Sequence, residues 1–191
     1  MSGAGFHVHG PHDHELEHAA HAAPDSMAGR LAVATAVIAT IGAIFAYMGG
    51  LTQSNAGLYK NEAAIKKTEA SNQWNYYQAK SSKQNLSELA VAIVAEERKP
   101  QYQKEVERYK AEKEQIKVEA EKLEAQARDW DQRSDTELHL HHRWAQATTA
   151  LQISIALAAM ALLTRRKWLE WGMFGVASIG LVLGGAASLH L

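Results

Sequence analysis

The chain alternates between uncharged apolar segments and one long segment rich in charge. Residues 31–51 and 145–164 carry no acidic or basic side chain, and residues 168–191 carry only Glu170. About 20 apolar residues in a helix cross the roughly 30 Å hydrocarbon core of a membrane. None of these runs has the polar face that a helix of a soluble bundle needs. The pattern therefore predicts three transmembrane helices, at 29–51, 145–164 and 168–191.

Small residues recur within two of these runs. Gly180 and Gly184 form a GxxxG pair, which is a common helix-contact pattern in membranes. A line of small side chains also follows the first run, at Ala28, Ala32, Ala36 and Thr40, and then at Gly42 and Ala46. Because small side chains let a second helix backbone approach closely, we expect both lines to be packing faces.

Residues 52–144 separate the first two runs and are predicted to form a helical hairpin outside the membrane. Residues 52–143 hold 16 basic and 16 acidic side chains. Pro100 cannot donate a helical hydrogen bond and disfavours helix at the residue before it, so we expect the turn near residue 100. The two arms, 52–99 and 101–144, would then be about 72 Å and 66 Å long at 1.5 Å per residue. Arms of nearly equal length suit a hairpin.

Seven-residue spacing in both arms predicts an antiparallel coiled coil. The outgoing arm has one line at Leu51, Leu58, Ile65, Asn72, Ala79, Leu86 and Ile93. The returning arm has a seam at Tyr102, Val106, Tyr109, Lys113, Ile116, Ala120, Leu123, Ala127, Trp130 and Ser134. Polar side chains such as Asn61, Thr68 and Asn75 make the outgoing seam weak for two helices alone. We therefore expect further helices to join it, from a homo-oligomer or another membrane protein.

A turn at Pro100 also predicts which side chains of the two arms lie at the same level. Trp74 and Tyr77 would meet Leu123, Ala127 and Trp130 on the returning arm. Aromatic pairs of this kind contribute about 0.5–1.5 kcal/mol beyond the area they bury. We take Trp74, Tyr76, Tyr77, Lys80 and Trp130 as the candidate interaction patch.

Residues 1–28 form a histidine-rich tail without Lys or Arg, for which a flexible segment is expected. His14 to His18 match the HExxH pattern of zinc proteases, but that chemistry needs a third ligand and a surrounding domain. Metal capture by His14, His18 and His21 remains open as an alternative, as it does for His139 and His142 before the second span. The interpretation is a tail with no defined metal site.

Composition excludes several classes of function. The 20 basic and 21 acidic residues leave no basic excess for nucleic acid, and cysteine is absent. Glu170 lies at the end of its span, where it can reach Arg166 or Lys167 rather than line an ion path. No nucleophile with a base, no carboxylate pair and no phosphate-binding loop is evident. We expect no enzymatic activity, no cofactor and no small-molecule substrate.

Basic residues beside the spans predict the orientation in the membrane. Arg165, Arg166 and Lys167 form the densest basic cluster near any span, in the short turn at 165–167. If this turn is cytoplasmic, the N-terminus is also cytoplasmic and the hairpin is periplasmic.

Residues 71–89 carry a family signature. Trp74, Tyr76, Tyr77 and the following Gln78, Ala79 and Lys80 form a W-x-Y-Y-Q-A-K core, and residues 164–168 read TRRKW. Both resemble the bacterial membrane family known as domain of unknown function 4337, over roughly residues 30–185. The resemblance implies a three-span protein of the bacterial inner membrane with a coiled segment. It implies no activity, cofactor or catalytic residue.

The sequence thus predicts an all-α, multi-pass protein of the bacterial inner membrane. Its expected role is that of an oligomeric scaffold or accessory subunit that carries a helical hairpin. Its partners would be the lipid bilayer and either further copies or another membrane protein. The alternative is a divalent-cation handling or channel-like protein, because long helices that lead into two C-terminal spans resemble the layout of some ion channels.

Overall fold

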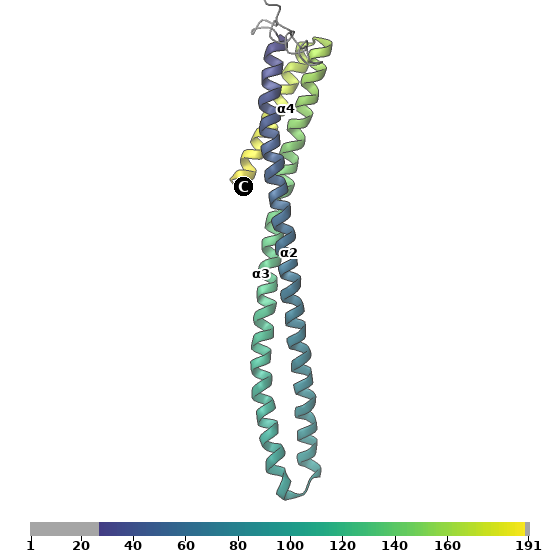
Figure 1. The fold of residues 1–191 in the computed structure, drawn as a ribbon, viewed down its shortest axis with the longest axis vertical. Coiled ribbons are helices and arrows are strands. Elements are labelled where there is room, and N and C mark those ends of the chain that lie inside the picture. The colour runs from purple at the N-terminus through teal and green to yellow at the C-terminus, as the bar shows by residue number, and fades with distance from the viewer. Residues whose placement is uncertain (1–26, 190–191) are drawn as a thin grey trace, which may run out of the picture. The chain divides into compact units, whose positions relative to one another are not determined.

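A computed structural model describes residues 27–189, and nearly all of them are helical (Figure 1). Helix α2 covers Met27–Ile93, the short helix η1 covers Glu96–Arg98, α3 covers Lys99–Thr164 and α4 covers Lys167–Ser188. The described residues contain no strand. The predicted all-α class is confirmed. The histidine-rich tail, including the HExxH pattern, lies almost entirely outside the described residues.

The described chain divides into two compact units, and α2 and α3 contribute to both. We call 27–51 together with 140–189 the apolar unit, and Thr52–His139 the charged unit. Within residues 27–189, three helices contain a segment that is long and apolar enough, by length and composition, to cross a membrane. In α2 and α3 those segments lie in the apolar unit, and α4 belongs to it entirely.

The core of the apolar unit is small. It is formed by Leu31, Ile38, Leu151, Ala158, Ala161, Leu169, Met173 and Ala177. The buried Ser154 hydroxyl donates a 2.9 Å hydrogen bond to the Met173 carbonyl, which joins α3 to α4. Only 11% of the most apolar window of α2, and 28% of those of α3 and α4, is buried. Most of the apolar surface of these segments therefore faces outward.

One of the two predicted small-residue faces is a contact. A Cβ atom added at Gly180 would lie 2.7 Å from Leu151 Cδ2, and one at Gly184 would overlap the Phe45 ring. The GxxxG expectation is thus confirmed. The line of small residues in α2 is a contact at Gly42, which is buried and whose added Cβ would lie 3.7 Å from Leu151 Cβ. The prediction of a packing face is wrong for the other members, because Ala28, Ala32, Ala36, Thr40 and Ala46 are exposed. The bulkier Leu31 and Ile38 are buried there instead, since they fill more of the space between the helices.

In the charged unit, α2 and α3 run antiparallel and contact each other along the unit (Figure 1). Helix α2 ends at Ile93, and the chain reverses through residues 94–98. Pro100 lies in the first turn of α3 rather than in the bend. This is where proline is tolerated, because the first backbone N–H groups of a helix have no partner within it.

The returning seam is confirmed, since every residue of it is buried or half-buried. The prediction that the outgoing line faces the returning arm is wrong, because Leu58, Leu86 and Ile93 are 61%, 66% and 74% exposed. Helix α2 faces α3 with another line, one position further along the chain. Its members are Thr52, Ala56, Tyr59, Ala63, Lys66, Ala70, Gln73, Tyr77, Lys80, Gln84, Ser87 and Val91. Alanines and polar side chains lie on the contact, and the large aliphatic ones lie outside it.

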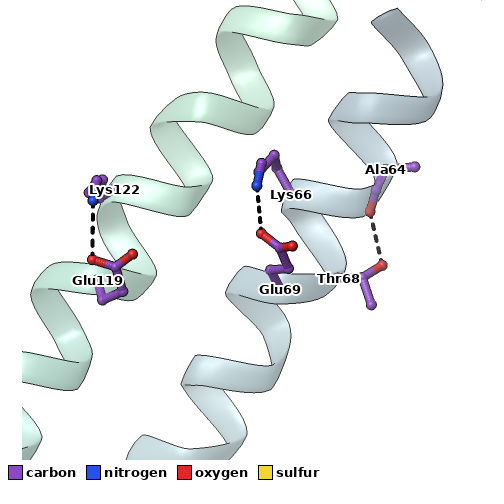
Figure 2. A network of polar contacts seen from close by, with 6 residues as sticks. All are labelled: Ala64, Lys66, Thr68, Glu69, Glu119 and Lys122. Carbon is purple, nitrogen blue, oxygen red and sulfur yellow. Dashed lines mark hydrogen bonds and ion pairs between the residues drawn. The ribbon is translucent and has the colours of Figure 1, made fainter. Parts of the chain in front are cut away.

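Ion pairs within each helix support the charged unit. On α3, three pairs join residues four apart: Lys117–Glu121, Glu124–Arg128 and Asp129–Arg133. Lys110 pairs with Glu107, three residues back. Figure 2 shows two further pairs of this kind, Lys66–Glu69 on α2 and Glu119–Lys122 on α3. Exposed pairs of this type each contribute only a few tenths of a kcal/mol.

Candidate interaction site

The signature stretch of α2 lies against α3 in the charged unit. Trp74 is half-buried, and its indole N–H donates a 2.7 Å hydrogen bond to Glu124 Oε1. Trp74 also lines an open groove of about 760 Å³, where small side chains such as Ala63, Ala70 and Ala127 are among the lining residues. Alanine at these positions leaves the groove open, because it has no side chain beyond Cβ to fill it.

Lys80 lies at the centre of a cluster of aromatic and charged groups. Its Nζ lies 2.5 Å from Glu112 Oε2, 5.1 Å from the centre of the Tyr76 ring and 5.6 Å from that of Tyr109. The Arg108 guanidinium also lies over the Tyr109 ring, at 4.9 Å. A cation over an aromatic face is attracted by the negative potential of the ring.

The electrostatics of this cluster favour the charged forms. The hydrogen bond to Glu112, and then that to Tyr76, raise the pKa of Lys80. The hydrogen bond from Lys80 lowers the pKa of Glu112. Both groups therefore stay ionised near neutral pH, where neither is available to transfer a proton. The arrangement joins α2 to α3 and does not resemble an acid–base site.

Tyr77 and Lys113 form the next contact between the helices. Lys113 Nζ lies 4.9 Å from the centre of the Tyr77 ring and donates hydrogen bonds to Ser81 Oγ at 3.0 Å and to Gln84 Oε1 at 3.1 Å. Trp74 packs edge-on against Tyr77, with 5.6 Å between ring centres. This lysine at a seam position thus has two hydrogen-bond acceptors and an aromatic face, which offset the cost of partly removing its charge from water.

Trp130 does not join this group. Its ring lies 5.5 Å from that of Tyr59, and the Arg133 guanidinium lies over it at 4.8 Å. The expected meeting of Trp74 and Tyr77 with Trp130 is therefore wrong. The bend lies a few residues before Pro100, which shifts the facing positions by about two helical turns.

The structure thus brings four of the five predicted patch residues together. Among them only Tyr76 is largely exposed, at 51%. Three residues of α3 are interaction partners of this group within the chain, and of these only Lys113 was predicted to face α2, as a member of the returning seam. Glu112 and Glu124 lie beside the seam positions, where acidic side chains of a charged helix usually face water, so no signal in the sequence indicated their contacts with α2.

The predicted topology residues form the connection between α3 and α4. Arg165 has a left-handed backbone with φ of 52°, and Arg166 is the extended residue before α4. Arg165, Arg166 and Lys167 are all exposed. Glu170 pairs with Arg30 at 3.4 Å rather than with this cluster, so it links the beginnings of α4 and α2.

The histidines before the second apolar run lie at the edge of the apolar unit. His141 Nδ1 lies 2.8 Å from the Gly49 carbonyl, while His139 and His142 are exposed. Within residues 27–189, no three His, Cys, Asp or Glu side chains are placed to hold a metal ion together.

These features define an all-helical protein with an apolar unit and a charged helical pair. The chain belongs to the family described as a domain of unknown function, DUF4337, which matches residues 27–190. No curated protein and no solved structure matches it. The predicted family is confirmed, and its description assigns no activity.

Proposed function

We propose that this protein is a non-enzymatic integral membrane protein that acts by assembly, as an oligomeric scaffold or an accessory subunit. The apolar unit would lie in the inner membrane of a bacterium, and the charged unit would form a coiled-coil hairpin in water on one side of it. The N-terminus would be cytoplasmic and the hairpin periplasmic, because Arg165, Arg166 and Lys167 favour the cytoplasmic side.

The outward-facing apolar surface is the observation that carries the membrane proposal. Val37, Ile44, Leu163 and Val182 are between 53% and 83% exposed, although all four are aliphatic. Soluble proteins rarely expose apolar patches beyond a few hundred Å², whereas lipid accepts such a surface without cost. Helix α4, with 22 residues, would be about 33 Å long, which matches a hydrocarbon core of roughly 30 Å.

The arrangement of charge supports a role in assembly. The aromatic and charged groups between α2 and α3 are used in contacts of one helix with the other, and they leave no proton donor or acceptor poised for reaction. What the charged unit offers to other molecules is a long helical surface, and such surfaces bind other helices.

Purification in a mild detergent, followed by measurement of the mass and identification of bound proteins, tests this proposal. We expect a particle that contains more than one copy of the chain, with or without a companion membrane protein. A single chain with nothing attached contradicts the proposal. Divalent-cation flux into liposomes that contain the purified protein would instead support the channel-like alternative.

A further inference from the structure

The outward side of α2 in the charged unit carries no charge. Three lines of positions point away from α3, beginning at Ser54, Gly57 and Leu58 and repeating every seven residues. Each line has six positions, and the last of them are residues 89, 92 and 93. We call these eighteen positions the outer face of α2. All eighteen are exposed, and none is acidic or basic. The eight charged residues of 52–93 all lie on the contact with α3 or beside it.

The outward side of α3 is very different. Its corresponding lines begin at Gln101, Lys104 and Glu107, and their seventeen positions in the charged unit are also exposed. Nine of the seventeen are charged. A helix face that water covers usually carries charged side chains, as α3 does. The outer face of α2 instead has the composition of a surface that is covered.

The large residues of this face follow the periodicity of a second helix contact. Leu58, Ile65, Leu86 and Ile93 stay on one side of α2 because they are multiples of seven apart. They are between 42% and 74% exposed in the single chain. This line was expected to face the returning arm, and the structure places it on the exposed side of α2.

Two hydroxyls of the face already have hydrogen-bond partners in their own helix. The Thr68 hydroxyl donates to the Ala64 carbonyl at 2.9 Å (Figure 2), and the Ser82 hydroxyl donates to the Gln78 carbonyl at 3.1 Å. Because these hydroxyls are already bonded to their own helix, covering them costs less than covering an unbonded group. Asn72 carries both a donor and an acceptor, so its amide can pair with an identical amide.

We infer that a second copy of this chain docks on the outer face of α2, in parallel, so that residues of the same number meet. A charge-free face offers nothing to complement a charged partner, and it meets its own copy without repulsion. Asn72 would then pair with Asn72, as a buried asparagine that sets register. The parallel orientation rests on the proposed function, because copies anchored in one membrane point the same way.

The size of the face suits such a contact. Residues 52–93 span about 63 Å at 1.5 Å per residue, and a helix is about 10 Å wide. One copy would therefore bury on the order of 600 Å², and two copies about 1,200 Å², the lower limit of stable specific interfaces. Confinement to one membrane raises the effective concentration of the copies. The charged outward side of α3 would stay in water.

Cysteine crosslinking in native membranes tests this inference, because the chain has no cysteine of its own. Single variants Leu58→Cys, Asn72→Cys and Leu86→Cys place a thiol on the outer face of α2, and Ala111→Cys and Ala125→Cys place one on the outward side of α3. We expect oxidation to give about tenfold more disulfide-linked dimer from the α2 variants than from the α3 variants. Equal yields, or no dimer from α2, would overturn the inference.

Three further measurements distinguish a failure of the docking face from a failure of the parallel arrangement or of the proposed function. Leu58→Cys coexpressed with Leu86→Cys should give no mixed dimer, and such a dimer would overturn the parallel arrangement. Leu86→Glu should lower the mass of the purified particle, whereas the matched Val118→Glu on α3 should not. If alkaline carbonate releases the chain from membranes while the α2 crosslinks form, the proposed function fails and the docking face stands. If the chain stays in the membrane without these crosslinks, the docking face fails alone.

Discussion

At individual positions, small side chains decide how closely the helices approach. Ala70 is 2% exposed and Ala120 is 0% exposed between the arms of the charged unit. In the apolar unit, a Cβ at Gly180 would also lie 3.2 Å from the Ala147 carbonyl oxygen. Backbone atoms cannot move aside as a flexible side chain can. Glycine at this position is therefore required by packing.

Gly180→Ala should destabilise the apolar unit. The added methyl meets the fully buried Leu151 and a backbone oxygen, and overpacking of this kind costs about 1–3 kcal/mol. We expect a lower midpoint in thermal denaturation of the detergent-solubilised protein. Gly175→Ala is the matched control in α4, because nothing lies within 4 Å of its added Cβ. An equal fall in the denaturation midpoint of both variants would show that the close approach at Gly180 is not the cause of the destabilisation.

Glu112→Gln should make the charged unit less stable at pH 7, with the melting temperature a few degrees lower. The pKa of Glu112 is lowered by Lys80, so its carboxylate stabilises the fold above the unfolded pKa of about 4.3 and loses this effect as pH falls through its folded pKa. The pKa of Lys80 is raised, so its contribution is complete below about 10.4 and is lost as pH rises through its folded value. Circular dichroism melts of native and variant protein should therefore converge below pH 4.

Glu114→Gln serves as the comparison for that experiment, since Glu114 is an exposed residue of the outward side of α3. Its melting temperature should differ little from that of the native protein across the same range. A difference between native protein and Glu112→Gln that persists unchanged into strong acid would contradict the assigned ion pair.

At the level of elements, the two long helices differ in how far their packing could be predicted. The seam of α3 was predictable because Val106, Ile116 and Leu123 are large and apolar, so the buried line and the hydrophobic line coincide. In α2 they do not coincide. Its contact line contains alanine, lysine and glutamine, and hydrophobicity instead points to the line of Leu58 and Leu86.

The position of the bend and the contacts of the candidate site could also be predicted only in part from the sequence. Pro100 indicates the beginning of α3, and the reversal itself falls at residues without proline or glycine, which gave no local signal. Once the facing positions move by about two turns, the partners of each aromatic side chain change. The cluster of Trp74, Tyr77 and Lys80 was predictable as a unit because its members are neighbours in sequence, and the position of Trp130 was not.

Ala70→Leu should therefore weaken the contact between α2 and α3. Three additional heavy atoms at a position that is 2% exposed force the helices apart, at a cost of about 1–3 kcal/mol. We expect a lower melting temperature for the helical signal of the charged unit. Ala111→Leu, on the exposed side of α3, should change stability by less than about 0.5 kcal/mol. If Ala70→Leu were tolerated equally well, the assigned contact line would be wrong.

At the level of the whole molecule, charge and apolarity are separated along the chain. Residues 52–143 hold 16 basic and 16 acidic side chains, and the apolar segments before and after them hold almost none. The same separation appears in the structure, where the apolar unit exposes aliphatic side chains and the charged unit exposes ion pairs. A single solvent does not suit both surfaces. This is the physical basis of the proposed membrane protein.

Labelling of engineered cysteines from each side of the membrane tests this central claim most directly. Ala95→Cys places a thiol at the bend between α2 and α3, and Thr164→Cys places one at the turn between α3 and α4. A membrane-impermeant maleimide applied to intact spheroplasts should label Ala95→Cys at once and Thr164→Cys only after permeabilisation. Labelling of both thiols from the same side without permeabilisation would contradict the account.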